Sequence, residues 1–391
     1  MRSVATCVLA ACILSGGCTY PTGMDHAGSS QPPSLAGTGL TYYWHTPLPT
    51  HGGERVERLW RLDELVYALT DQRLLIAVDA RVGKVLWSYR IEHAPEPIFS
   101  PCHPEAPIKL PMRSAGSREV RECDAVLINT IGHLIVLDRS NGEPLRDMPL
   151  TFTANTGGAA NGKNFYAGAV GGNYHAFDYD VGADSWVLST SATIRVPPVL
   201  DGNRLYVGSE DDKFYATRIG LRPDKRWIAT LGGSIIAPFH VGPVGCYVPC
   251  EDGSVYAFDN ANGEPLWPAY VCHEALSSPI QAGDQTLFQR AENDVIFAIN
   301  RRNGRLRWKT TGARSVLANM NDMAYVLDNA HKLRIYTEEL GESQAIVPLT
   351  GLDVFLSNTT VPAIYATGTD GNLYCIRLES AEPLTARMLA D

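Results

Sequence analysis

The chain has 391 residues, of which 45% are hydrophobic and 19% are charged, a balance that is typical of a globular protein and excludes a mainly disordered one. Its formal net charge is -9 and it contains no long run of Lys or Arg, which argues against nucleic acid or an anionic membrane surface as the main partner. The 35 Gly and 25 Pro residues favour many turns and few long helices, and the length favours several domains or one large repetitive domain.

The N-terminus has the layout of a secretory signal. Residues 1–17 contain one Arg, an apolar run and then small residues, and the run is too short to cross a bilayer. Small residues before a Cys resemble a bacterial lipobox, so we predict that Cys18 is lipidated after cleavage. Cys12 in "LAAC" is the alternative attachment site, and a plain cleaved signal is the other alternative. A lipidated chain would be anchored to a membrane rather than span it.

The next segment differs in composition from everything that follows. Residues 18–38 are rich in Pro, Gly and Ser and have almost no apolar pattern, so we predict a flexible tether there. One folded domain is predicted at 39–391, and no later segment is long and apolar enough to span a bilayer.

One motif recurs along the whole domain. In "AFDNANGEPLW", residues 257–267, an Asp is followed four residues later by Gly and eight residues later by Trp. The Asp-equivalent positions are 79, 138, 178, 218, 259, 300, 337 and 377, at intervals of 59, 40, 40, 41, 41, 37 and 40. A period near forty residues indicates an array of supersecondary units. The residues that match the motif are Asp79, Gly83, Trp87, Asp178, Gly182, Trp186, Trp227, Asp259, Gly263, Trp267, Gly304 and Trp308.

Each unit is predicted to be β-structure. In the fifth copy, the strand-like segments "GCYVPC", "VYAFD" and "EPLWPAY" are separated by "EDGS" and "NANG", and Asp, Asn and Gly accept the backbone angles of tight hairpins. Another apolar segment lies upstream, which makes about four antiparallel strands per unit. Eight copies therefore predict an all-β protein, an eight-bladed β-propeller of four-stranded antiparallel blades.

The motif residues have separate structural roles in this prediction. The Asp ends the third strand and accepts backbone N–H groups across the turn, and the Gly supplies a positive φ. The Trp lies on the outer strand, where a ring can wedge between blades and bury about 150–250 Å². Because Trp recurs in nearly every unit, we interpret it as inter-blade packing rather than as a ligand-stacking residue.

The ring also has to close, because an open array would expose strand edges. The eighth copy has Thr385 in place of the motif Trp, whereas "LTYYWHTPL", residues 40–48, is an orphan strand that contains Trp44. We therefore predict that this N-terminal strand joins the last blade, with Trp44 in the empty position, and that "VERLWRL" begins the first blade.

The interval of 59 residues indicates an insertion at about 92–124. The segment is rich in proline, and a Pro-rich exposed loop on a rigid scaffold is a natural partner-binding element; a passive surface loop is the alternative. Cys102 and Cys123 bracket the insertion, and outside the cytoplasm we predict a disulfide that joins them.

Further cysteines follow in strand-like segments. Cys246 and Cys250 share one predicted strand, where residues four apart are separated by about 13 Å, too far for one zinc ion. We interpret Cys246, Cys250 and Cys272 as buried thiols or as one disulfide of open pairing, with a zinc site that includes His273 as the alternative. Cys375 is predicted to be a buried strand residue.

No pattern for catalysis is readable. The His residues are scattered, no Gly-rich phosphate loop precedes a helix, and the Ser, His and acidic residues of "VGSED" and "HAFD" are ordinary turn chemistry on propeller strands. We therefore predict no catalytic, cofactor-binding or metal-binding residue and no bound cofactor.

The repeat resembles the pyrroloquinoline-quinone-type β-propeller repeat, whose motif runs Tyr-Ala-hydrophobic-Asp with Gly and Trp at the spacings given above. The copies of Asp79, Asp178 and Asp259 match it in full and the copy of Asn300 nearly so, and the resemblance covers nearly the whole chain after residue 39. The resemblance is specific for fold and weak for function, since one fold carries many activities.

Two branches of that family imply different functions. In quinoprotein alcohol dehydrogenases a quinone on the axis is held by a disulfide between adjacent cysteines, a stacking Trp and calcium, but this sequence has no Cys-Cys pair and is shorter. The other branch is small lipoproteins, in particular the propeller subunit of the outer-membrane β-barrel assembly machinery, which is not an enzyme. That subunit is similar in length, lipid anchor and eight-bladed plan, whereas the insertion and the extra cysteines depart from it.

The second branch implies a non-catalytic scaffold. Such a protein would be lipid-anchored at the periplasmic side of the outer membrane and would bind other envelope proteins, such as outer-membrane assembly components. A quinone-dependent oxidoreductase and an envelope sensor that binds a small ligand are the alternative functions.

Overall fold

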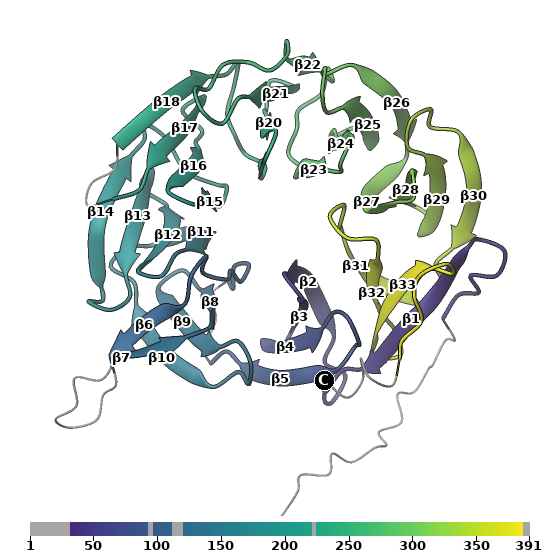
Figure 1. Ribbon diagram of the computed structural model, residues 1–391, viewed down its shortest axis with the longest axis horizontal. Coiled ribbons are helices and arrows are strands. Elements are labelled where there is room, and N and C mark those ends of the chain that lie inside the picture. Colours follow the sequence, from purple (N-terminus) through teal and green to yellow (C-terminus); the bar gives the residue numbers. More distant parts are fainter. Residues whose placement is uncertain (1–31, 93–96, 112–119, 221–223, 386–391) are drawn as a thin grey trace, which may run out of the picture.

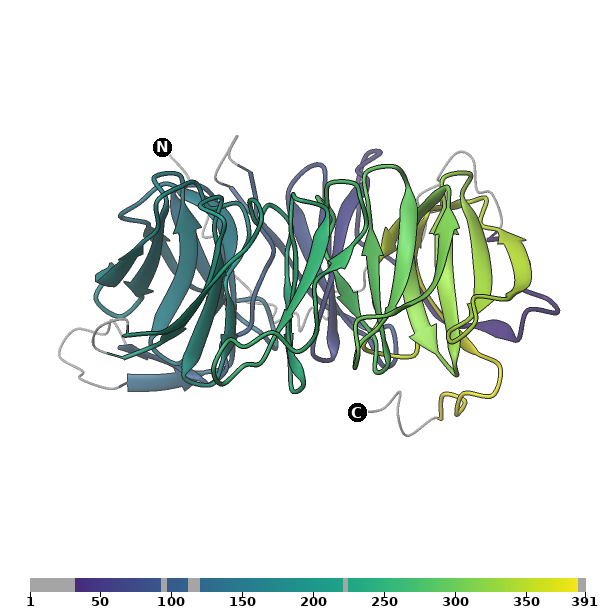
Figure 2. The same cartoon turned by 90° about the horizontal axis from the view of Figure 1, so that it is seen from above.

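The computed structural model describes residues 32–92, 97–111, 120–220 and 224–385. These residues form a ring of eight antiparallel sheets around a central opening, and no helix occurs among them (Figure 1). From the side the ring is a flat disc (Figure 2). The described ranges accordingly contain no helix that could cross a membrane. The predicted eight-bladed β-propeller is confirmed.

Six blades are contiguous in sequence and have four strands each, counted from the axis to the rim. The first blade comprises β2 (Val56–Leu62), β3 (Leu65–Thr70), β4 (Leu74–Asp79) and β5 (Val85–Arg90). The third comprises β11 (Ala154–Ala160), β12 (Asn164–Ala169), β13 (Asn173–Asp178) and β14 (Ala183–Ser189). The fourth comprises β15 (Val199–Asp201), β16 (Arg204–Gly208), β17 (Lys213–Arg218) and β18 (Asp224–Thr230).

The next three blades follow the same plan. The fifth blade comprises β19 (His240–Gly242), β20 (Gly245–Pro249), β21 (Ser254–Phe258) and β22 (Tyr270–Val271). The sixth comprises β23 (Gln281–Ala282), β24 (Thr286–Arg290), β25 (Val295–Asn300) and β26 (Leu306–Thr311). The seventh comprises β27 (Ala313–Met320), β28 (Met323–Asp328), β29 (Lys332–Thr337) and β30 (Ser343–Pro348).

The eighth blade is built from two distant parts of the chain. Its inner strands are β31 (Leu352–Leu356), β32 (Ile364–Gly368) and β33 (Asn372–Leu378), and its outer strand is β1 (Leu40–Pro47). β1 pairs antiparallel with β33, from Leu40 opposite Leu378 to Pro47 opposite Asn372. Figure 1 shows the purple β1 beside the yellow β33. The predicted closure by an N-terminal strand is confirmed.

The second blade has three regular strands, β8 (Ala125–Asn129), β9 (His133–Asp138) and β10 (Pro144–Pro149). Residues 97–107, which we call the strap, take its innermost position, where Cys102 forms an isolated antiparallel bridge with Leu127. The strap is irregular because its prolines lack the N–H that a continuous ladder needs. A separate hairpin follows, formed by β6 (Ile108–Pro111) and β7 (Val120–Cys123).

The core lies between neighbouring blades rather than in one centre. All six residues of β3 and all six of β4 are buried, because both faces of a middle strand are covered by other blades. At the first joint, Tyr67 and Trp87 of blade 1 pack against Val126 and Leu137 of blade 2. This two-sided burial explains why the middle strands read as continuous apolar runs.

The segment before β1 is part of the folded body. Leu35 is buried in the cluster between blades 7 and 8, together with Val347 and Leu349. The hydroxyl of Tyr42 donates a 2.8 Å hydrogen bond to the carbonyl oxygen of Pro33. Within residues 32–38, predicted as the end of a flexible tether, Pro33 and Leu35 are therefore buried, and the rest of that tether, residues 18–31, lies outside the described residues.

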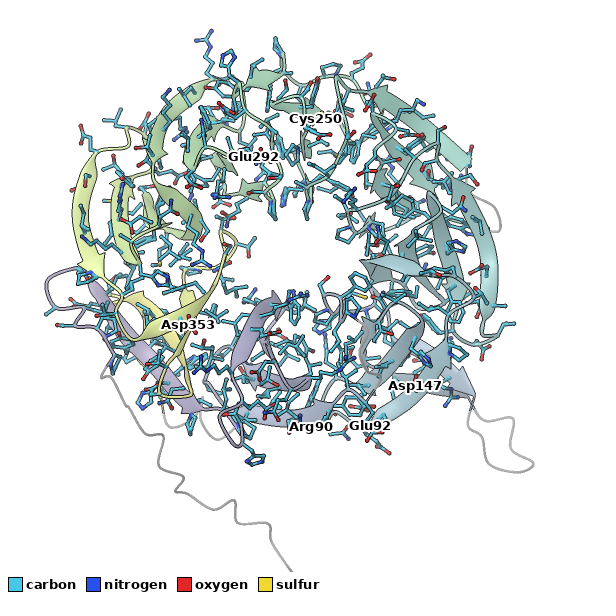
Figure 3. The ribbon with its side chains drawn as sticks, turned by 180° about the vertical axis from the view of Figure 1, so that it is seen from behind. Arg90, Glu92, Asp147, Cys250, Glu292 and Asp353 are labelled. Carbon is cyan, nitrogen blue, oxygen red and sulfur yellow. The ribbon has the colours of Figure 1, made fainter. Side chains whose placement is uncertain are left out.

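The disc has two distinct faces. The motif face carries the Asp–Gly turns between third and fourth strands and the turns between first and second strands. The acidic face carries the turns between second and third strands and the connections from one blade to the next. Figure 3 views the ring from the side opposite to Figure 1 and labels Cys250 and Glu292, which belong to the acidic face.

Candidate functional site

The Asp of each motif copy orders the turn that follows the third strand. The Oδ1 atom of Asp79 accepts a hydrogen bond from the backbone N–H of Arg81 at 2.8 Å, and that of Asp259 accepts one from Ala261 at 2.7 Å. Arg81 and neighbouring backbone N–H groups hold the pKa of Asp79 below its usual range, although burial opposes them as the largest single influence. These carboxylates therefore order the motif turns.

Five Trp side chains join neighbouring blades through one pair of contacts, which we call the indole lock. Each Nε1 donates a hydrogen bond of 2.8–3.3 Å to a backbone oxygen in the next blade. Each ring also covers the motif Gly of that blade, where an added Cβ would come within 2.7 Å of a ring or Cβ carbon. The locks are Trp44 on Ala80 and Gly83, Trp87 on Arg139 and Gly142, Trp227 on Asn260 and Gly263, Trp267 on Arg301 and Gly304, and Trp308 on Glu338 and Gly341.

Three of the eight joints lack the lock. Between blades 2 and 3, Arg146 takes the Trp position, and an added Cβ at Gly182 would meet nothing within 4 Å. Between blades 3 and 4, the indole nitrogen of Trp186 is buried with no hydrogen-bond partner among the described residues. Between blades 7 and 8, Ala345 stands in the Trp position, and the N-terminal segment with Leu35 packs at that joint.

The strap connects blades 1 to 4 and so crosses two of the three unlocked joints, 2–3 and 3–4. The guanidinium of Arg58 in blade 1 donates to the oxygen of Ile98 at 3.0 Å. Further along the strap, the N–H of Glu105 donates to the oxygen of Ala160 in blade 3, and the Glu105 carboxylate accepts from the N–H of Gly202 in blade 4, both at 3.0 Å. With the bridge to blade 2, residues 97–107 of the insertion brace four blades of the ring.

His103 is the centre of a polar network that fixes the strap. Its Nε2 lies 2.8 Å from the Tyr67 hydroxyl, and its Nδ1 lies 2.7 Å from Oδ2 of Asp63. Arg139 forms ion pairs with both Asp63 and Asp124. Burial lowers the pKa of His103, which favours a neutral ring that donates to Asp63 and accepts from Tyr67. Tyr67 is fully buried, so its hydroxyl is available to His103 but not to solvent.

A groove of about 890 Å³ lies beside the strap at the inner ends of blades 1 to 4. Arg139 lines it between Asp63 and Asp124, so much of its charge is already paired within the chain. The remaining lining mixes apolar and small residues with Arg61, Glu105 and several prolines. The groove therefore combines apolar walls with an internally paired charged cluster.

Carboxylates gather on the acidic face of blades 4 to 6, a region visible in Figure 3 where Glu292 is labelled. We call this set the acidic rim; its members are Glu210, Asp212, Glu251, Asp252, Glu274 and Glu292. Glu210 is paired with Arg195, whereas the other five form no ion pair with any residue the structure describes. The rim is therefore a concentrated negative surface that the protein itself does not neutralise.

Sequence reasoning missed the acidic rim, although a signal was present. The turns "EDD" 210–212, "EDG" 251–253 and "END" 292–294 recur at the forty-residue period, at the same place in successive units. Equivalent positions in a propeller lie on one face, so the period alone could have brought these turns together.

The predicted disulfide between Cys102 and Cys123 is wrong, because both side chains are thiols. Both are buried in the same apolar cluster, but Cys102 lies opposite Leu127. An extended chain from Leu127 back to Cys123 covers about 13 Å, whereas a disulfide holds its Cα atoms roughly 5.5–6 Å apart. Burial raises the pKa of Cys102 to about 12, so it is protonated at neutral pH.

The remaining described cysteines, Cys246, Cys250, Cys272 and Cys375, are also buried thiols. In the part of the chain that the structure describes, no group of three or more His, Cys, Asp or Glu residues is arranged to hold a metal ion. Cys18 and Cys12, the two predicted lipid-attachment sites, lie outside the described residues.

The chain is similar to one protein family over most of its length. It matches the family model of the outer membrane protein assembly factor BamB over residues 41–216 and 251–382. No curated protein matches it.

Two solved structures share its architecture. BamB from Moraxella catarrhalis superposes with a TM-score of 0.66 at 16% identity, over 88% of this chain and 99% of that chain. The computationally designed Ika8 protein superposes with a TM-score of 0.60 at 12% identity, over 84% of this chain and 98% of that chain. At these identities the likeness shows the fold alone. Because the family model covers more than half of the sequence, the chain belongs to the family of the outer membrane protein assembly factor BamB.

Proposed function

We propose that this protein is a non-catalytic envelope lipoprotein that works as a docking scaffold in outer-membrane protein assembly. In this proposal Cys18, or alternatively Cys12, carries the lipid, and the body lies on the periplasmic side of the outer membrane. The observation that carries the docking role is the acidic rim, where five carboxylates lack an ion pair with any described residue. Its partner is an envelope protein with a basic docking segment, since opposite charges steer association and fix orientation.

The start of β1 lies on the motif face, since the oxygen of Gly39 accepts a 2.9 Å hydrogen bond from the N–H of Glu379. In this proposal the lipid anchor holds the protein from that side, and the acidic face is turned towards a partner. A rigid disc also presents its loops at little ordering cost.

Charge removal on the rim tests this function. Glu251, Asp252, Glu274 and Glu292 would be changed together to Gln or Asn, and the membrane-anchored protein would be recovered after cross-linking for mass spectrometry. We expect at least a tenfold loss of the co-purifying envelope proteins, because exposed charges dominate the encounter, and weaker capture by wild type at high salt.

The matched control removes four exposed carboxylates from the motif face, Glu143, Glu264, Glu339 and Glu342. This control should retain the partners. Equal losses in both variants, or full retention by the rim variant, would contradict docking through the acidic rim. A quinone absorbance in the purified protein would contradict the non-catalytic role.

A further inference from the structure

A second cavity lies between blades 6 and 7, away from the strap and its groove. Its volume is about 140 Å³, roughly the space of four to five water molecules. Its polar walls are Arg290 and Ser278 of blade 6, Arg314 and Ser315 of blade 7, and Ser357, which follows β31. Phe288, Ile296 and Val316 supply an apolar part.

The two guanidinium groups at this cavity are not equally compensated. Arg290 is ion-paired with Asp294 and donates to the hydroxyl of Ser278 and the oxygen of Ala313, each at 3.3 Å. Arg314 makes no hydrogen bond or ion pair with any residue the structure describes. Arg314 is exposed, so the cavity is lined by one solvent-accessible guanidinium without a described partner, in a chain whose net charge is -9.

Blade 4 shows how an arginine at the equivalent position is paired. Arg195 of blade 4 is the counterpart of Arg314, and its guanidinium is paired with Glu210. Asn329 is the counterpart of Glu210, because the two make equivalent backbone bonds. The N–H of Glu210 donates to the oxygen of Thr193, two residues before Arg195. The N–H of Asn329 donates to the oxygen of Gly312, two residues before Arg314. Asn329 is neutral, and its amide donates to Asp294 at 2.8 Å.

We propose that this cavity binds a carboxylate carried on a short apolar stem. The carboxylate supplies the counter-charge to Arg314 that Glu210 supplies to Arg195, and charge-assisted hydrogen bonds to carboxylates are the strong ones. The hydroxyls of Ser315 and Ser357 line the polar side, whereas Phe288 and Ile296 contact the stem. A phosphate, which is polar on every side, fits this half-apolar lining less well.

Calorimetric titration with sodium propionate tests the site on the whole protein. We expect saturable binding of propionate and none of neutral propionamide, which has the same shape without the charge. Arg314→Gln should weaken propionate binding at least tenfold, because it removes the uncompensated charge. Arg195→Gln, the matched change at the paired position of blade 4, should leave binding unchanged.

Asn329→Glu is the converse variant, since it gives blade 7 the counter-charge that blade 4 has. It should abolish propionate binding while circular dichroism shows an intact β-fold. If this variant is unstable beside Asp294, the Arg314→Gln result decides alone. Propionate binding that is equal in wild type and Arg314→Gln, or no binding to wild type, overturns the proposal.

The carboxylate has two sources, a free short-chain acid or a polypeptide that enters the central opening. An N-acetylated Ala-Ala-Val tripeptide with a free C-terminus would be titrated against its amidated form. Binding of the free-acid peptide alone supports a polypeptide source, and binding of propionate without either peptide supports a free acid. The acidic rim is not involved, so loss of partner capture in the rim variant and loss of propionate binding in Arg314→Gln are separate outcomes.

Discussion

The Trp and the Gly of the motif form one contact between neighbouring blades. The sequence alone predicts that the Trp packs between blades and that the Gly needs a positive φ. It does not reveal that the two meet, because the Trp of one copy covers the Gly of the next copy. The failed disulfide has the same origin: Cys102 and Cys123 bracket one loop in sequence, but strand register sets their separation.

Ala substitutions at two glycines measure how much this Trp–Gly contact contributes to the free energy of unfolding. Gly83 and Gly182 have φ values of 76° and 75°, but only Gly83 lies under an indole ring. Both Ala variants incur the cost of a positive φ, about 1 kcal/mol. Gly83→Ala should lose roughly 1–3 kcal/mol more, because its Cβ would overlap the Trp44 ring. Urea unfolding measures both, and equal losses would show that the indole contact adds nothing.

The strap is the element that sequence reasoning described least well. Its proline content correctly separated it from the regular repeat, but a Pro-rich stretch has no period from which its neighbours can be deduced. Its seat is made by small residues of β11: a Cβ at Gly157 would come 2.5 Å from the Ser100 hydroxyl. This fit exists only in the folded ring, so it cannot be predicted from the sequence.

Replacing residues 97–107 by a Gly/Ser linker tests the bracing role. Because joints 2–3 and 3–4 lack the indole lock, amide hydrogen exchange should accelerate in β11 and β15. Blades 5 to 7 are joined by their own locks and serve as the internal reference. Unchanged exchange in β11 and β15, or uniform acceleration around the ring, would rule out a local brace.

At the level of the whole molecule, forty-residue periodicity was enough to predict eight blades and the strand that closes them. The period could also have located the acidic rim, since it superimposes the turns of successive units on one face. It could not locate the cavity between blades 6 and 7, which depends on the departure of one unit from its neighbours. Asn329, where blade 4 has Glu210, is such a departure, and its amide bonds Asp294, the ion-pair partner of Arg290.

Removing the Trp that closes the propeller should lower the free energy of unfolding more than removing an equally buried Trp that makes no indole lock. Trp44 and Trp186 are 6% and 7% exposed, but only Trp44 has a hydrogen-bonded indole nitrogen. Trp44→Ala should reduce the free energy of unfolding by about 3–5 kcal/mol, and Trp186→Ala by less. Denaturant titration gives both values; a Trp44→Ala effect within about 0.5 kcal/mol would remove the role of this Trp in closure.

The pairing of β1 with β33 also restricts the order in which parts of the protein can fold during synthesis. Leu40 is translated before any blade exists, and its partner Leu378 appears only after seven blades have been made. Such a long sequence separation slows formation of a contact. β1 therefore waits with an unpaired backbone edge, an aggregation hazard, throughout synthesis. The first strand can therefore join the last only after nearly the whole chain has been made.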